Sequence, residues 1–187
     1  MRLLLIKHAR PLVDPARPSH EWRLPERGQD DAARLAEQLR PYAIEKMFSS
    51  DEPKAIETAQ IVAKLLGIPT EAAHGVHEHD RSNVPHMRSG EFISHIELFF
   101  RRPDDLTLGV ETANQCARRF EEAIDELVRG SAGSIAVVTH GTVLSLYLSQ
   151  LNAGKPFDLW RRMGLPSYAV IDTATRQVRH LVEKLDD

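Results

Sequence analysis

Two histidines stand where short apolar runs end in a turn. Residues 2–7 lead directly to His8, and residues 134–139 lead directly to His140. Each run is typical of a strand that is covered on both faces, so we expect both histidines at the carboxyl ends of buried strands. Ligands of open α/β sheets bind outside those strand ends. The two imidazoles are therefore predicted to meet in one site.

The neighbours of each histidine favour an anionic ligand. Lys7 and Arg10 flank His8, and adjacent cations lower the pKa of an imidazole, which favours its neutral, nucleophilic form. Gly141 and Thr142 follow His140 at the start of an apolar helical segment, where free N–H groups form an anion site and glycine leaves room for a ligand. A purely structural role is the alternative for either histidine.

A predicted alternation of strands and helices positions these residues. Strands are expected at 2–7, 47–48, 134–139, 168–172 and 177–182, and helices at 26–40, 53–66, 111–129 and 141–151. Ser50 or Asp51 is expected to cap the second helix, with Pro53 in its first turn and Gly67 after its end. This order predicts an α/β fold, a three-layer sandwich with a mostly parallel central sheet and an antiparallel edge strand.

One stretch of the chain is less regular. Residues 69–109 are rich in histidine, proline and arginine, with one amphipathic segment near 91–101. We expect this stretch to be an insertion over the strand ends, within a single domain that spans 1–187. Four arginines, at 81, 88, 101 and 102, either reach a large anionic substrate or belong to a solvated loop.

Composition limits the classes of function. The 187 residues are 42% hydrophobic and 27% charged, and the formal net charge is -3, which argues against nucleic acid or a membrane surface as partner. The single cysteine, Cys116, cannot form an intrachain disulfide. The first apolar run is too short for a signal peptide and nothing approaches a membrane span, so a cytoplasmic protein is expected.

Five segments, in one order along the chain, resemble the histidine phosphatase superfamily, whose fold is phosphoglycerate mutase-like. Lys7-His8-Ala9 stands in place of its Arg-His-Gly triplet. The others are 24–28 (Leu-Pro-Glu-Arg-Gly), 49–59 (similar to Ser-Ser-x-x-x-Arg-Ala-x-x-Thr-Ala), 109–112 (similar to Gly-Glu-Ser) and 137–141 (similar to Val-Val-Ser-His-Gly). The resemblance covers most of the chain.

The resemblance implies a mechanism without metal or cofactor. His8 attacks phosphorus in line and becomes phosphohistidine, which water hydrolyses. His140, Lys7 and Lys54 bind the phosphoryl oxygens. An acid after the strand that follows the second helix protonates the departing oxygen; Glu78 is the first choice and Asp80 the second.

The chain departs from the family in its phosphate pocket. Lysines replace both arginines, at Lys7 and Lys54, and Ala9 replaces a glycine. Lysine offers a point charge instead of a bidentate fork, and each lost contact costs roughly 1.5–3 kcal/mol, or on the order of 10- to 100-fold in rate. Arg10 is a candidate replacement that points a guanidinium at the phosphate.

The predicted function is hydrolysis of a small phosphorylated metabolite or a phosphoprotein. A phosphate-binding or regulatory member of the fold with weak or no turnover is the alternative, and a phosphoglycerate-type mutase is less favoured because such mutases are longer. A metalloprotein is a third alternative, prompted by the histidines 74, 77, 79 and 86, although they match no closed zinc motif. The sequence leaves the oligomeric state open.

Overall fold

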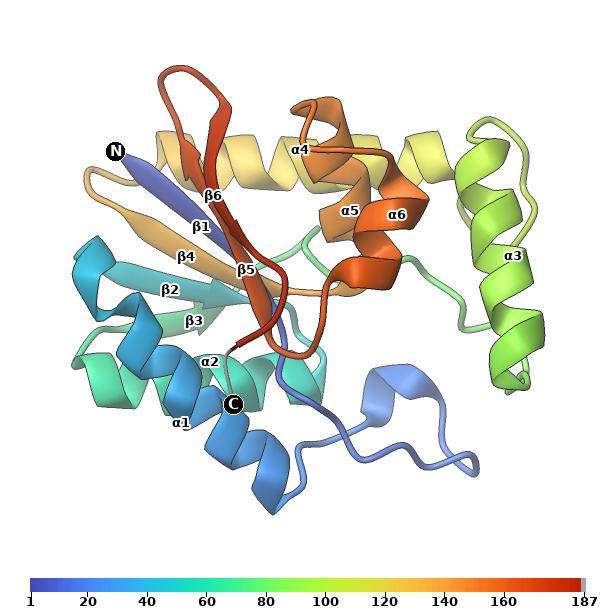
Figure 1. Ribbon diagram of the computed structural model, residues 1–187, viewed down its shortest axis with the longest axis horizontal. Coiled ribbons are helices and arrows are strands. Elements are labelled where there is room, and N and C mark those ends of the chain that lie inside the picture. Colours follow the sequence, from blue (N-terminus) through green and yellow to red (C-terminus); the bar gives the residue numbers. More distant parts are fainter. Residues whose placement is uncertain (186–187) are drawn as a thin grey trace.

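A six-stranded sheet lies at the centre of the structure, a computed structural model that describes residues 1–185 (Figure 1). The strand order is β3-β2-β4-β1-β5-β6, in which β1–β4 run parallel and β5 pairs antiparallel with both β1 and β6. The strands are β1 (Arg2–Lys7), β2 (Lys46–Ser49), β3 (Thr70–Ala72), β4 (Ile135–Thr139), β5 (Ser167–Asp172) and β6 (Gln177–Val182). The predicted parallel centre and antiparallel edge are confirmed.

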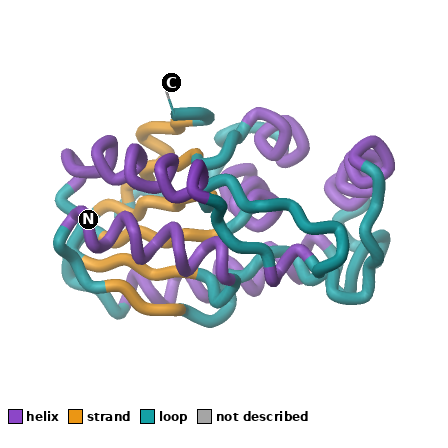
Figure 2. Tube along the Cα trace, turned by 90° about the horizontal axis from the view of Figure 1, so that it is seen from below, coloured by secondary structure: helices purple, strands orange, loops and turns teal. Residues whose placement is uncertain are grey.

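Helices flank this sheet on both faces (Figure 2). They are α1 (Glu26–Leu39), α2 (Pro53–Leu66), α3 (Ser89–Arg101), α4 (Ala113–Arg129), α5 (Gly141–Gln150) and α6 (Pro156–Arg162), with short 3-10 turns η1 (Ser19–Glu21) and η2 (Arg40–Tyr42). None of the helices found in residues 1–185 has the length and apolar character needed to cross a membrane.

Alternate residues of β1 belong to two separate hydrophobic cores. Leu3 and Leu5 pack with side chains from α3, α4, α5 and α6, whereas Leu4 and Ile6 pack with side chains from α1 and α2. Successive side chains of a strand point to opposite faces, so a strand covered on both faces must be apolar at every position. The continuous apolar run therefore led correctly to a three-layer fold.

Local sequence explains several helix ends. The Thr112 hydroxyl accepts the Gln115 N–H at 3.2 Å, and the Gln115 side chain accepts the Thr112 N–H at 2.8 Å, which forms a capping box before α4. Gly67 ends α2 with a φ of +71°. The structure corrects one cap, because Glu52, not Ser50 or Asp51, is the N-cap position of α2. The Ser50 hydroxyl instead accepts the Glu52 N–H at 3.2 Å.

Two elements differ from the sequence-based expectation. Residues 70–72, expected within an insertion, form β3, which pairs in parallel with β2 at the edge of the sheet. The helix α6 was not predicted. It has seven residues, of which Leu159 is buried, so it offers too few turns for a helical period to stand out.

Candidate active site

The two histidines lie side by side at the carboxyl edge of the sheet. β1 and β4 pair with Lys7 opposite Thr139, so the residues that follow the two strands occupy equivalent positions. The His8 N–H donates to the Thr139 carbonyl at 3.0 Å. The imidazole centroids are 5.1 Å apart, with 61° between the ring planes, and both histidines are buried. The predicted convergence of His8 and His140 is confirmed.

The His8 ring is held as one neutral tautomer. Its Nδ1 lies 2.8 Å from the Ala9 carbonyl oxygen, which can only accept, so Nδ1 carries the proton and Nε2 carries the lone pair. Burial, followed by His140 and Lys54, lowers the pKa of His8 well below its ordinary value. Lys7 adds to this effect, but burial is the main cause. A neutral imidazole with a free Nε2 lone pair is a competent nucleophile.

The turn after His8 is anchored to α2. The Ala9 N–H donates to the Thr58 hydroxyl at 3.0 Å, and that hydroxyl donates to the Lys54 carbonyl at 2.7 Å. Thr58 is fully buried, so these two bonds are not exchanged with water. The helix that carries Lys54 therefore also fixes the backbone of the nucleophile.

A buried carboxylate, Glu52, stands between two of the predicted phosphate ligands. It forms an ion pair with the Lys54 ammonium, and its Oε1 lies 3.3 Å from Nε2 of His140. His140 Nε2 also lies 2.8 Å from the Ser50 hydroxyl, whereas its buried Nδ1 has no partner within residues 1–185. Burial and then Lys54 lower the pKa of His140. Glu52 was not predicted from the sequence, although an acidic residue two positions before Lys54 is close enough in sequence to indicate an ion pair.

Lys7 lies against the start of α5. Its Nζ donates to the Met163 carbonyl at 2.7 Å. A Cβ placed on Gly141 would lie 3.3 Å from that same Nζ. Burial lowers the pKa of Lys7 to about 8, although Glu78 acts in the opposite direction. The absence of a side chain at Gly141 thus allows the ammonium to reach the helix N-terminus.

Glu78 caps the N-terminus of α5. Its carboxylate accepts the N–H groups of Thr142 at 3.1 Å and Val143 at 3.3 Å, and that of His79 at 2.8 Å. Arg81 lies 3.8 Å from the same carboxylate and donates to the Thr142 hydroxyl at 3.3 Å. Although burial raises the pKa of Glu78, Arg81, His140 and these N–H donors lower it well below its ordinary value. Glu78 is therefore ionised, and its carboxylate accepts hydrogen bonds from N–H groups at the start of α5, where the sequence predicted an anion site.

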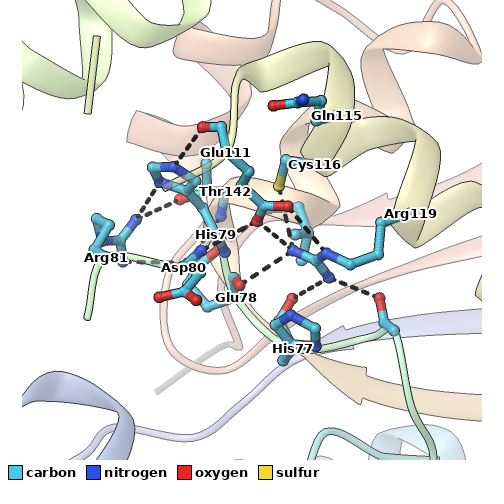
Figure 3. A network of polar contacts seen from close by, with 12 residues as sticks. His77, Glu78, His79, Asp80, Arg81, Glu111, Gln115, Cys116, Arg119 and Thr142 are labelled. Carbon is cyan, nitrogen blue, oxygen red and sulfur yellow. Dashed lines mark hydrogen bonds and ion pairs between the residues drawn. The ribbon is translucent and has the colours of Figure 1, made fainter. Parts of the chain in front are cut away.

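Arg119 on α4 holds the loop that carries Glu78 (Figure 3). Its guanidinium donates to the carbonyls of Gly75 at 2.8 Å, His77 at 3.1 Å and Glu78 at 3.3 Å. It also forms two hydrogen bonds with Glu111, at 2.6 and 3.1 Å. These bonds position Glu78 from outside the site. No pattern in the sequence separates Arg119 from the other arginines of its helix.

Two other predicted residues have partners of their own. Arg10 is half exposed, and its Nε lies 3.7 Å from the Asp31 carboxylate on α1. The Asp80 carboxylate accepts the Ser82 N–H at 2.9 Å. In the part of the chain that the structure describes, no hydrogen bond or ion pair joins either residue to His8 or His140.

The histidines of the irregular stretch do not gather into a ligand set. Within residues 1–185, no three or more histidine, cysteine, aspartate or glutamate side chains are placed to hold a metal ion. His79 is buried, packs on Phe99 with ring centroids 4.2 Å apart, and lies 3.2 Å from the Glu111 carbonyl. It therefore has a structural role in this loop.

The site as a whole combines a neutral nucleophile with nearly balanced charge. Lys7, Lys54 and Arg81 provide three cations, and Glu52 and Glu78 provide two carboxylates. Such a site can attack an electrophile that carries negative charge, with the cations stabilising the charge that develops.

The family model described as histidine phosphatase superfamily (branch 1) matches residues 3–185. No curated protein matches the sequence. Solved structures with the same fold include YhfR of Bacillus stearothermophilus, at 22% identity and a TM-score of 0.77, over 100% of this chain and 98% of that one.

Two further similar structures are phosphatases by name. One is a mycobacterial glucosyl-3-phosphoglycerate phosphatase, with 19% identity, a TM-score of 0.75 and coverage of 98% of this chain and 99% of that chain. The other is a phosphoserine phosphatase of Entamoeba histolytica, with 15% identity, a TM-score of 0.76 and coverage of 98% and 97%. At these identities the likeness establishes the shared phosphoglycerate mutase-like fold.

Proposed function

Because this chain belongs to the histidine phosphatase superfamily, we propose that it hydrolyses phosphomonoesters through a phosphohistidine formed on His8. One observation carries the proposal most strongly. The Ala9 carbonyl fixes the proton on Nδ1 of a buried, neutral imidazole, so the Nε2 lone pair is free to attack. Packing alone does not explain why a buried histidine with a free Nε2 lone pair lies beside a second histidine and two lysines.

In the first step, Nε2 of His8 bonds to phosphorus while the ester P–O bond breaks. The leaving oxygen needs a proton, and we assign the role of proton donor to Glu78. Its carboxylate is ionised in the free protein, but a bound phosphoryl group brings negative charge close to it and so raises its pKa. In the second step, Glu78 accepts a proton from water as the water oxygen bonds to phosphorus, and the P–Nε2 bond breaks, which releases phosphate and restores the lone pair of His8.

Positive side chains stabilise the transferring group in this proposal. Lys7, Lys54 and Arg81 supply the charge that metal ions supply in other phosphoryl transfer enzymes, so we propose a metal-independent reaction. Lysine at positions 7 and 54 lacks the bidentate fork of arginine, which supports slow turnover. Arg10 keeps its place as a candidate ligand, on condition that it leaves Asp31.

The substrate proposed is a small phosphorylated metabolite or a phosphoprotein. Similar structures include phosphatases named for glucosyl-3-phosphoglycerate and for phosphoserine, which supports a phosphate monoester of this kind. We also propose that the protein works in the cytoplasm, because its single thiol, Cys116, is buried without a disulfide partner.

A second candidate is a phosphate-binding member of the fold with little or no turnover. The Glu52 carboxylate favours it, since this group already pairs with Lys54 and contacts His140. A bound phosphate has to displace Glu52 from both. Affinity for phosphate and the rate of transfer are both lowered by this competition.

Acid and alkaline trapping distinguishes the two candidates. The protein is incubated with a chromogenic aryl phosphate and with a ³²P-labelled phosphate donor, then quenched at acid and at alkaline pH. A hydrolase gives nitrophenolate release and an alkali-stable, acid-labile phosphoryl group that is missing in His8→Ala. Phosphate binding with neither release nor label identifies the second candidate, and label that persists in His8→Ala rejects His8 as the nucleophile.

A further inference from the structure

Three aromatic side chains gather beside the N-terminus of α5. Phe92 comes from α3, and Phe157 and Trp160 come from α6; we call them the aromatic cluster. The helix α6 contacts both α5 and α3 (Figure 1). The Trp160 ring lies parallel to Phe157, at 9° with centroids 6.2 Å apart, and its centroid is 6.1 Å from that of Phe92.

Trp160 reaches the glycine at the start of α5. A Cβ on Gly141 would lie 3.5 Å from Cδ1 of Trp160 and 3.3 Å from Nζ of Lys7. The indole and the ammonium therefore border the same space. We therefore expect a group attached to a phosphoryl group held by Lys7 to lie close to the indole.

Arg81 connects the other end of the cluster to the proposed acid. Its guanidinium lies 5.2 Å from the centre of the Phe92 ring, within cation–π range. The same guanidinium lies 3.8 Å from Glu78 and 3.3 Å from the Thr142 hydroxyl. We expect a leaving oxygen that takes its proton from Glu78 to depart beside Arg81, whose guanidinium lies over the Phe92 ring.

The rings of the cluster keep part of their surface open. Phe92, Phe157 and Trp160 are only partly buried, whereas Phe99 and Phe100, further along α3, are 0% and 8% exposed. Partly exposed aromatic rings beside a cation favour another aromatic ring, through offset or edge contacts and through burial of apolar area.

We propose that the aromatic cluster is a leaving-group subsite, which selects phosphomonoesters with an aromatic ring close to the ester oxygen. This inference rests on the proposed function, because it takes the phosphoryl group to be bound beside Lys7 and Gly141. Trp160 and Phe92 contact the ring of the substrate, and Arg81 lies between that ring and Glu78. Phe157 supports Trp160 from its stacked position.

Two non-hydrolysable phosphonates test the subsite without turnover. Phenylphosphonate and methylphosphonate share the phosphoryl head and differ in the attached group, and calorimetry gives both dissociation constants. We expect phenylphosphonate to bind on the order of 10-fold more tightly to the wild type. Trp160→Ala and Phe92→Ala should lose most of this preference. Trp160→Phe, which keeps a ring, and Leu98→Ala, at an exposed position of α3, should retain it.

Equal affinities in the wild type, absence of binding by either phosphonate, or a preference that survives both alanine substitutions would overturn the inference. Loss of the preference in Leu98→Ala would overturn it too, since that change leaves the cluster intact. The trapping experiment reports separately on function. A phosphohistidine without ring preference rejects the subsite alone, and ring preference without a phosphohistidine rejects the hydrolase alone.

Discussion

Lys7 makes the proposed phosphate site sensitive to pH near 8, well below the pH at which a lysine ordinarily loses its charge. Burial lowers its pKa from 10.5 to about 8, a difference that corresponds to about 3.5 kcal/mol at about 1.4 kcal/mol per pH unit. Below pH 8 the side chain is charged and binds the substrate anion; as the pH rises through 8 the charge is lost. The charged fraction falls from about 0.9 at pH 7 to about 0.1 at pH 9. We therefore expect kcat/KM to fall about 10-fold over that interval.

The comparison with Lys7→Arg isolates this group. An arginine stays charged over the whole range, so kcat/KM of the variant divided by that of the wild type should rise about 10-fold from pH 7 to pH 9. The ratio cancels the ionisation of the substrate and of every other side chain. The assay follows an aryl phosphate at concentrations well below KM. A ratio that stays constant from pH 7 to pH 9 would refute the reasoning.

Two more substitutions test residues that the structure added to the site. Glu52→Gln removes the carboxylate that competes for Lys54, so calorimetry should show inorganic phosphate binding at least about 10-fold more tightly. Glu57→Gln, on the helix that Glu52 precedes, should leave the affinity for phosphate unchanged. Weaker binding in Glu52→Gln would contradict the competition. Arg119→Lys loses most of the hydrogen bonds that hold the loop of Glu78, so urea denaturation should show a free energy of unfolding lower by about 2 kcal/mol, and kcat should fall. Arg118→Lys, at an exposed position of the same helix, should show neither effect. An unchanged kcat in Arg119→Lys would show that Arg119 does not position Glu78.

The sequence sufficed where a pattern is local. The apolar run of β1 predicts burial on both faces, and the helical spacing of 111–129 predicts α4, because each pattern is complete within one segment. β3 has three residues, Thr70–Ala72, none of them fully buried, and is a strand because β2 provides its hydrogen-bond partners. A strand that depends on a partner distant in the sequence cannot be predicted from its own residues alone.

The same distinction applies to the site. His8 and His140 could be predicted to meet because strand ends in an α/β sheet meet at one edge. Glu52 could not be predicted to contact His140, and Arg119 could not be predicted to hold Gly75, because those contacts depend on the paths of α2, of α4 and of the loop between β3 and α3. The pKa of His8 was expected to be low, but through its charged neighbours, and burial proved the larger cause.

The central pairing of β1 with β4 also governs how the molecule assembles. Leu3 lies opposite Ile135, 132 positions later in the chain, so the middle of the sheet closes one of its longest loops. Contacts of such separation slow folding, and until they form, β1 and β2 present unpaired strand edges that invite aggregation. During synthesis, β1 cannot pair with β4 until residues 135–139 have emerged. The pairing of β1 with β4 should therefore both bring the two histidines together and cover the strand edges that are prone to aggregation.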